Sequence, residues 1–179
     1  MEFLKKNPKI FILSGKAESG KSVVADIIKN YYLEHDIKAV VISYASYLKE
    51  YAKEVLGWDG SEESKPRDFL QQLGVELIKN QIDSNMLIKR IKEDVMVYSY
   101  FFDVIVISDA RFIDEIEVIK NNFSNVSVIH ILGKDNSLTF EQKNHSTETG
   151  LDDYSEYDFV INNDGSREEL KKKVFEVLK

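Results

Sequence analysis

Residues 9–28 read KIFILSGKAESGKSVVADII and combine three features in direct succession. The run from Lys9 to Ser14 is short, apolar and followed by glycine, which predicts a buried parallel strand. From Lys21 onward, apolar residues recur at helical spacing as far as Tyr31, which predicts one face of a helix. Between the strand and the helix, residues 15–22 match the pattern G-x-x-x-x-G-K-[ST] in full. This arrangement predicts a loop that binds a chain of phosphates.

The chemistry of phosphate binding accounts for each part of this loop. Gly15 and Gly20 permit backbone angles that turn successive N–H groups inward around an anion. Lys21 is placed to reach the β- and γ-phosphates of a nucleoside triphosphate, and the Ser22 hydroxyl is placed to ligate Mg²⁺. A glycine-rich turn that only connects strand to helix is the alternative. We interpret the whole loop as the ATP-binding element: Gly15, Lys16, Ala17, Glu18, Ser19, Gly20, Lys21 and Ser22.

The composition fits one globular domain over residues 1–179 and argues against several other classes of protein. Apolar residues make up 43% and charged residues 31% of the chain, which argues against a disordered protein. The 24 basic and 31 acidic residues give a net charge of −7, which would repel a nucleic acid polymer. There is no cysteine, so disulfides and thiolate catalysis are excluded.

The sequence also argues against a membrane protein. The apolar run near the N-terminus, Ile10 to Leu13, is too short for the core of a signal peptide. No stretch approaches the roughly 18 apolar residues that a membrane span requires. We therefore expect a cytoplasmic protein.

Four further apolar runs predict strands, and the segments between them predict helices. The strands are expected at Ala39–Ser43, Val104–Ser108, Val126–Leu132 and Phe159–Ile161. The helices are expected at Leu48–Leu56, Arg67–Gln81, Met86–Tyr98, Ile113–Lys120 and Arg167–Leu178. One face of the second helix is formed by Leu70, Leu73, Leu77 and Ile78. Apolar strands that alternate with helices predict an α/β fold: a five-stranded parallel sheet between two layers of helices.

The third predicted strand is followed by two charged residues that suit a phosphate site. Asp109 comes after four apolar residues, a pattern that places a carboxylate near the Mg²⁺ of a phosphate loop. Arg111 is one of only four arginines, and its planar fork suits phosphate oxygens better than a lysine does. The alternatives are an aspartate that caps a strand or a helix and an arginine in a surface ion pair. We interpret Lys21, Asp109 and Arg111 as catalytic residues, with Ser22 and Asp109 as metal ligands.

A phosphate loop identifies a nucleotide site but leaves the reaction open. The chain is too short for a motor or a transporter ATPase, and it has no N-K-x-D run for reading guanine. Residues 44–102 form a long, helical insertion between the second and third predicted strands, which could hold an acceptor molecule. We therefore favour a small phosphotransferase.

Several blocks of sequence together resemble a known family. They are SGKAESGKS at 14–22, YASYLKEYAKEVLGW at 44–58, KPRDFLQQLGVELIKN at 65–80, VISDARF at 106–112 and NHSTETGLDDYSEYDFVINNDGSREEL at 144–170. In this order, the chain from about residue 10 to residue 175 resembles the deoxynucleoside monophosphate kinases of bacteriophages and their bacterial relatives. The phosphomevalonate kinases share part of these blocks and look like a sister group.

The resemblance implies a P-loop kinase fold in which ATP and Mg²⁺ serve the phosphorylation of a small acceptor. It implies that Arg67, Gln71 and Arg111 bind this acceptor, and that Arg111 also meets the charge that develops on the transferred group. For Arg67, the alternative is an ordinary residue at a helix start. For Gln71, it is an exposed helix glutamine. Ser22 stands where the family often carries aspartate, which favours conventional ligation of Mg²⁺ by a hydroxyl group.

The resemblance further implies a lid over about residues 133–151 that closes over the phosphates and excludes water. For His145, the alternative to a functional role in the lid is an ordinary residue of a solvated loop. Glu148 is expected to order the lid. In related P-loop kinases the loop after the last strand wraps the donor adenine, which implies contacts from Asn163 and Gly165. A tight turn that caps the last helix is the alternative there. The candidate lid residues are Lys134, Lys143, His145 and Glu148.

Three functions stay open on the sequence alone. The favoured one is transfer of the γ-phosphate of ATP to a (deoxy)nucleoside monophosphate. The others are a kinase of phosphomevalonate or dephospho-coenzyme A, and a regulator that binds ATP without transferring phosphate. The expected partners are ATP and a small phosphorylated acceptor, and a homodimer is compatible with the sequence. The sequence decides neither the base nor the sugar of the acceptor.

Overall fold

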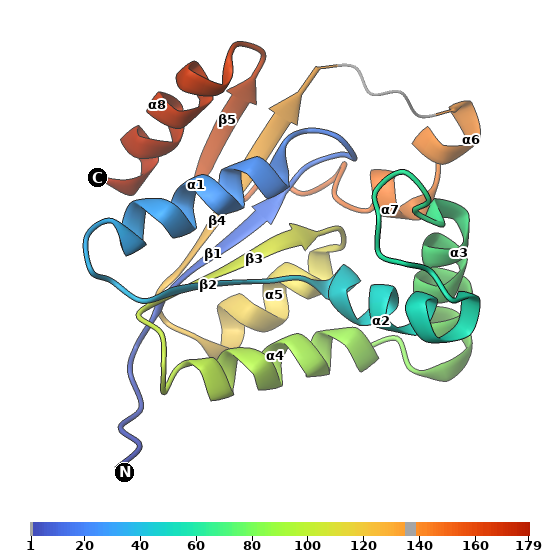
Figure 1. Cartoon of the computed structure of the whole chain (residues 1–179), viewed down its shortest axis with the longest axis horizontal. Helices are drawn as coiled ribbons and strands as arrows, with labels where there is room; N and C mark the ends of the chain where they lie inside the picture. Colours follow the sequence, from blue (N-terminus) through green and yellow to red (C-terminus); the bar gives the residue numbers. More distant parts are fainter. Residues whose placement is uncertain (1, 135–138) are drawn as a thin grey trace.

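The chain folds around a five-stranded sheet in which all strands run parallel (Figure 1). The computed structural model describes residues 2–134 and 139–179. The predicted sheet is confirmed, and each strand lies within one or two residues of its expected bounds. The order across the sheet is β2-β3-β1-β4-β5, with β1 at Lys9–Ser14, β2 at Ala39–Ile42, β3 at Val104–Ala110, β4 at Val126–Gly133 and β5 at Phe159–Asn163.

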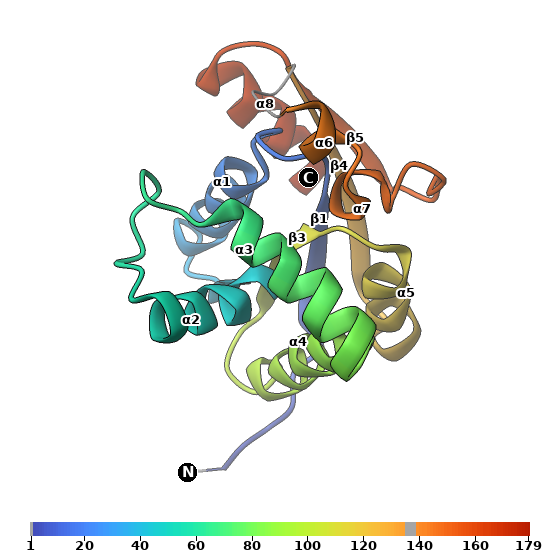
Figure 2. The same cartoon turned by 90° about the vertical axis from the view of Figure 1, so that its right-hand side faces the viewer.

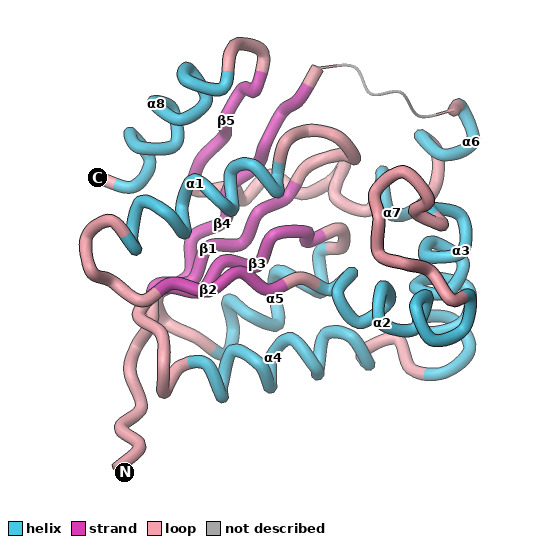
Figure 3. Tube along the Cα trace, in the orientation of Figure 1, coloured by secondary structure: helices cyan, strands magenta, loops and turns pink. Residues whose placement is uncertain are grey.

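Helices cover both faces of the sheet and complete the expected three layers (Figures 1 and 3). On one face lie α1 (Lys21–Leu33) and α8 (Arg167–Leu178). On the other lie α4 (Met86–Tyr98) and α5 (Ile113–Asn122). None of the helices in the described part of the chain is long and apolar enough to cross a membrane.

The central strand β1 shows why the sequence around it is apolar without interruption. Phe11 and Leu13 belong to the core under α1 and α8, whereas Ile10 and Ile12 belong to the core under α4 and α5. Successive side chains of a strand point to opposite faces, and all four are at most 1% exposed. Because helices cover both faces, the four central positions of β1, Ile10 to Leu13, are all apolar.

The insertion between β2 and β3 lies over the carboxyl ends of the strands, except for its last helix, α4, which covers one face of the sheet. It contains α2 (Tyr44–Leu56), α3 (Arg67–Gln71), η1 (Gln72–Ile82) and then α4. Figure 2, which views the molecule from this side, shows α3 and the helix that follows it crossing in front of the strand ends. The insertion is therefore placed where parallel α/β sheets bind their ligands.

The prediction of a single α-helix over Arg67–Gln81 is wrong, because most of this segment is a π-helix. The α-helical part ends at Gln71, and η1 continues as a π-helix, as in the hydrogen bond from the Asp83 N–H to the Ile78 carbonyl. The wider turn changes which residues share a face, so that Ile78 is buried while Leu77 is 42% exposed. π-helical turns are rare in proteins, and those that do occur are often found at functional sites.

Two other segments differ from expectation. Helix α2 begins four residues before the predicted start at Leu48, because the Ser43 side chain accepts a hydrogen bond from the Ser46 N–H and caps the helix. The expected lid contains two short helices, α6 (Phe140–Lys143) and α7 (Ser146–Thr149). The part of the lid at 135–138 lies outside the described residues.

Ile12 provides a test of the central position of β1. Its side chain is fully buried, so Ile12→Ala should leave a cavity and lower the free energy of unfolding by about 3 kcal/mol in urea denaturation. Val160 lies on the edge strand β5 and is 53% exposed, so Val160→Ala should change this free energy by less than about 0.5 kcal/mol. Similar losses at the two positions would contradict the strand order.

Candidate active site

The loop of residues 15–22 connects β1 to α1 at the carboxyl edge of the sheet (Figure 1). Gly15 has a φ of 139° and Gly20 a φ of 99°, both in the region that favours glycine. A Cβ added to Gly15 would lie 2.4 Å from the Ile131 carbonyl oxygen, and one added to Gly20 would lie 2.3 Å from the Asn163 Nδ2. The loop therefore needs both glycines, for its backbone angles and for its packing against β4 and β5.

Lys21 begins α1, and its ammonium group lies within the glycine loop. Nζ donates hydrogen bonds to the carbonyl oxygens of Gly15 and Lys16, each at 2.7 Å. Burial and then the charge of Arg111 lower the pKa of Lys21 from 10.5 to about 7. A phosphate in the loop would favour the protonated form of this lysine. The next residue, Ser22, is exposed and presents its hydroxyl at the first turn of α1.

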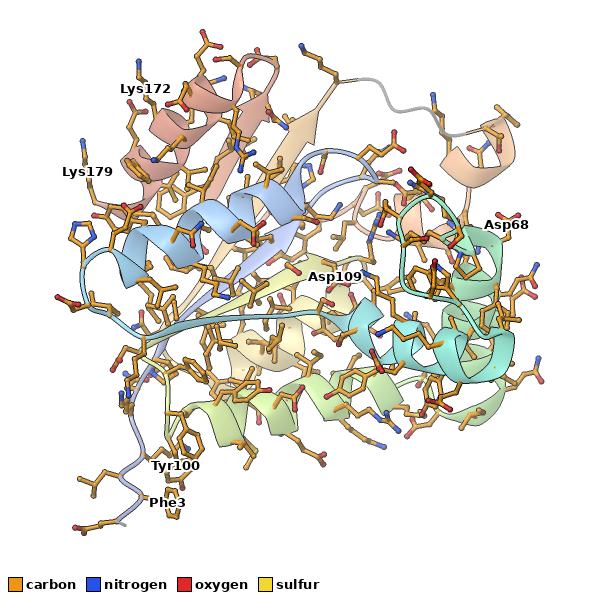
Figure 4. All side chains as sticks on the ribbon, in the orientation of Figure 1. Phe3, Asp68, Tyr100, Asp109, Lys172 and Lys179 are labelled. Atoms are coloured by element: carbon orange, nitrogen blue, oxygen red, sulfur yellow. The ribbon has the colours of Figure 1, made fainter. Side chains whose placement is uncertain are left out.

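Asp109 lies near the end of β3 and holds the start of α2 (Figure 4). Its Oδ1 accepts a hydrogen bond from the Tyr44 N–H at 2.8 Å, and its Oδ2 accepts one from the Ala45 N–H at 2.9 Å. Burial raises the pKa of this carboxyl group. In the structure, Asp109 therefore caps the start of α2, which was the alternative to a catalytic role. Each carboxylate oxygen keeps a further lone pair for a second partner.

Arg111 follows β3 and forms an ion pair with Glu148 of α7. Its Nη1 lies 2.5 Å from the Glu148 Oε1 and donates a second hydrogen bond to the Thr147 carbonyl at 3.2 Å. The other carboxylate oxygen of Glu148 accepts a hydrogen bond from the Ala17 N–H in the glycine loop at 2.7 Å. Glu148 is thus in contact with the loop itself, which the sequence interpretation as a lid residue did not include.

Helix α3 brings the two remaining acceptor candidates to the same region. Arg67 lies 3.5 Å from the Glu18 carboxylate in the glycine loop and 3.6 Å from the carboxylate of Glu62. The Gln71 amide donates a hydrogen bond to the Thr147 hydroxyl at 3.4 Å. The insertion therefore reaches both the glycine loop and α7, and Gln71 is held by α7 rather than simply exposed.

Two further lid candidates, Lys134 and Lys143, lie at a cavity of about 270 Å³ beside the glycine loop, whereas His145 lies at the start of α7. Lys134 and Lys143 are exposed and line this cavity together with Glu148. His145 caps α7, because its Nδ1 accepts a hydrogen bond from the Thr147 N–H at 3.3 Å. The lysines thus add positive charge at the rim of the loop, while His145 orders the short helix that carries Glu148.

The last residue of β5, Asn163, and the turn after it, with Gly165, contain the residues expected to contact adenine. Asn163 Nδ2 donates a hydrogen bond to the Ser19 carbonyl at 2.9 Å and so holds the glycine loop. Gly165 lies in the turn before α8, where the Ser166 hydroxyl accepts from the Glu169 N–H and the Glu169 carboxylate accepts from the Ser166 N–H. This segment therefore forms the turn that caps α8, as the alternative interpretation expected. In addition, Asn163 holds the glycine loop, which the sequence did not indicate.

A second cavity, of about 170 Å³, adjoins the first at Lys16, His130 and Glu148 and has an aromatic lining that sequence reasoning missed. His130 of β4 stacks on Tyr157 with ring centroids 4.4 Å apart, and its Nδ1 lies 3.0 Å from the Ser14 hydroxyl. Burial, followed by the charges of two nearby lysines, lowers the pKa of His130. One signal was present in the sequence: a histidine inside the apolar run VSVIHIL.

The parallel sheet and the glycine loop at the carboxyl end of its central strand define the class: this is a P-loop kinase fold. Similar solved structures include an APS kinase of Mycobacterium tuberculosis, with 14% identity, a TM-score of 0.54 and coverage of 97% of this chain and 98% of that chain. A gluconokinase from Sinorhizobium meliloti has 14% identity and a TM-score of 0.51, with 97% and 93% coverage. At this identity, the similarity shows the fold alone.

Within this class, the chain belongs to the deoxynucleotide monophosphate kinase family, whose model matches residues 41–174. The deoxynucleotide monophosphate kinase of Escherichia phage RB69 is 34% identical over 114 residues. The alignment covers 63% of this chain and 44% of the phage protein, so the chain spans less than half the length of that relative. The family resemblance found in the sequence is confirmed.

Gly133 tests the packing of β4 against the glycine loop. A Cβ at this position would lie 2.5 Å from the Ser19 Cα, so alanine must displace the loop backbone. We expect Gly133→Ala to weaken ADP binding at least about tenfold in calorimetric titration. In the control Gly74→Ala, the added Cβ meets the flexible Leu48 side chain at 3.0 Å, and ADP affinity should not change. Unchanged affinity in Gly133→Ala would show that the loop tolerates the displacement.

The lowered pKa of Lys21 predicts proton uptake when phosphate binds. Above about pH 7 this lysine is largely neutral in the empty site, and an anion shifts its pKa back towards 10.5. ADP binding at about pH 8.5 should therefore take up close to one proton, measured by calorimetry in buffers of different ionisation enthalpy. Lys21→Arg should abolish the uptake, because arginine stays protonated.

The same shift fixes the sign of a stability effect. Between the folded pKa of about 7 and the ordinary value of 10.5, the unfolded chain binds a proton at Lys21 that the folded chain lacks. This residue's contribution to stability should therefore rise with pH across that window. If the Lys21→Arg variant took up as many protons on ADP binding as the wild type does, the group whose pKa shifts would not be Lys21.

Proposed function

We propose that this protein transfers the γ-phosphate of ATP to a deoxynucleoside monophosphate and so forms two diphosphates. The observation that carries this proposal is the approach of two arginines from different elements to neighbouring residues of one glycine loop. Arg67 meets Glu18, and Arg111 meets Ala17 through the carboxylate of Glu148. A protein that only binds ATP does not need cationic groups that face the loop from the insertion. Membership of the family supports the same class of acceptor.

The glycine loop would supply the donor site. Its N–H groups and the N-terminus of α1 direct partial positive charge at a phosphate chain. Lys21 already lies within the loop, where it would meet the β- and γ-phosphates and stabilise the transition state. The adenine would lie beside Asn163 and Gly165 at the end of β5, where Asn163 also supports the loop.

Arg67, Gln71 and Arg111 would serve the acceptor. Phosphoryl transfer depends on holding two anions in line and on neutralising the charge of the moving group. The fork of Arg111 suits the acceptor's phosphate and the transferred group, and Arg67 on α3 lies beside Glu18 of the glycine loop. The amide of Gln71 would turn to the base. Because the acceptor oxygen is already part of an anionic phosphate, no strong general base is required.

The residues present fit Mg²⁺ held partly by the nucleotide. Mg²⁺ at phosphate sites usually has one or two protein ligands and completes its shell with waters and phosphate oxygens. The exposed Ser22 hydroxyl and the remaining lone pairs of Asp109 supply that number of oxygen ligands. When bound, the ion would neutralise charge on the transferred group.

Residues 133–151 would form the lid. Lys134 and Lys143 bring positive charge to the cavity beside the glycine loop, and His145 orders α7. Closure over the phosphates would exclude water and so prevent the hydrolysis of ATP. A cytoplasmic location and a homodimer stay predictions of the sequence.

A coupled assay of ADP release tests the function. The panel contains the common deoxynucleoside and ribonucleoside monophosphates together with phosphomevalonate and dephospho-coenzyme A. We expect Mg²⁺-dependent release of ADP with at least one deoxynucleoside monophosphate. Turnover with phosphomevalonate or dephospho-coenzyme A alone would replace the proposal with another kinase. ATP binding without release on any acceptor would favour the regulator.

Arg111→Lys separates the acceptor site from the donor site. Lysine keeps the charge but loses the bidentate fork, so acceptor affinity and turnover should fall about 30-fold, equivalent to about 2 kcal/mol. ATP affinity should change far less, because the glycine loop and Lys21 are intact. Calorimetric titration and steady-state kinetics measure both, with Arg167→Lys at the exposed start of α8 as a control. An equal loss of ATP affinity would place Arg111 in the donor site.

A further inference from the structure

The side chain of Glu148 bridges the glycine loop and Arg111. Its Oε2 accepts the hydrogen bond from the Ala17 N–H at 2.7 Å, and its Oε1 lies 2.5 Å from the Arg111 Nη1. Glu148 is only 6% exposed. A buried carboxylate needs donors of this kind, so both of its oxygens are committed to groups of the candidate active site.

These donors are of the kind that proteins use to bind phosphate. Backbone N–H groups of a glycine loop and the fork of an arginine both suit phosphate oxygens. Lys21 is close enough that its pKa responds to Arg111 and to Glu148, beyond the larger effect of burial. Glu148 therefore fills an anion position with a group that belongs to the chain itself.

We propose that Glu148 is an internal substitute for a nucleotide phosphate, which must displace it from Ala17 and Arg111. The Ala17 N–H has one proton to donate, so a carboxylate and a phosphate oxygen compete for it. Two anions in this partly buried space also repel each other. Phosphate binding thus exchanges one anion for another. The inference rests on the proposed function for the identity of the ligand, whereas the contacts of Glu148 stand apart from it.

The exchange would reach α7 through the neighbours of Glu148. The Thr147 carbonyl accepts from Arg111 at 3.2 Å, and the Thr147 hydroxyl accepts from Gln71 at 3.4 Å. At the other end of α7, a Cβ on Gly150 would lie 2.6 Å from the Arg111 carbonyl oxygen. Helix α7 is therefore packed directly on the acceptor residues. Release of Glu148 would couple the position of this part of the lid to the presence of phosphate.

Equilibrium binding of pyrophosphate tests this proposal. Glu148→Gln keeps the shape of the side chain and removes its charge, so the ligand no longer has to displace a carboxylate. We expect this variant to bind pyrophosphate about tenfold more tightly than the wild type in calorimetric titration at low ionic strength. The control is Glu156→Gln, an exposed residue of the same segment that pairs with Lys120 at 3.0 Å. It should bind pyrophosphate as the wild type does, which excludes an effect of net charge.

Unchanged or weaker binding by folded Glu148→Gln would overturn the proposal and make Glu148 a support for Arg111. If that variant does not fold, Glu148→Ala serves instead, because it removes the carboxylate from both Ala17 and Arg111 and should also tighten binding. Tight binding of pyrophosphate without transfer to any acceptor would refute the proposed function and leave this inference standing. A wild type that binds neither pyrophosphate nor ADP would overturn both.

Discussion

The glycine loop is packed so closely against β4 and β5 that a Cβ fits neither at Gly15 nor at Gly20. The Ile131 carbonyl lies under Gly15, and Gly133 passes the backbone of Ser19. Asn163 holds the Ser19 carbonyl from the far side. The loop is therefore fixed by the ends of β4 and β5 as well as by β1 and α1. Its N–H groups can be preorganised for an anion only because this packing is present before any ligand arrives.

The strand order explains how the other site residues come to the same place. In a parallel sheet all carboxyl ends lie at one edge, and β1 in the centre has β3 on one side and β4 on the other. From β3, Asp109 fixes the first N–H groups of α2, which anchors the insertion to the strand next to the loop. The candidate acceptor wall and the glycine loop are thus attached to adjacent strands, so their relative position follows from the sheet.

The sequence predicts those features that depend on local pattern. The strands are found because both faces of the sheet are buried, and the glycine loop because its angles demand particular residues. The winding of residues 72–82 is not found, since tertiary packing rather than residue spacing selects a π-helix there. The contact of Glu148 with Ala17 joins residues 131 positions apart. No local pattern encodes such a contact. The sequence therefore predicts Glu148 as a lid residue but does not predict its hydrogen bond to the glycine loop.

The candidate active site brings the cationic side chains of Lys21 and Arg111 close together, and their like charges repel. Lys21 and Arg111 lie close enough to lower the pKa of Lys21 after the larger effect of burial. Two features of the structure reduce this repulsion. Lys21 can release its proton near neutral pH, and the guanidinium group of Arg111 is paired with the carboxylate of Glu148. A bound phosphate would reverse both, because it would favour the charged lysine and, as proposed above, compete with Glu148 for the arginine. Burial and then the charge of Arg111 thus lower the pKa of Lys21, while Glu148 balances the charge of Arg111.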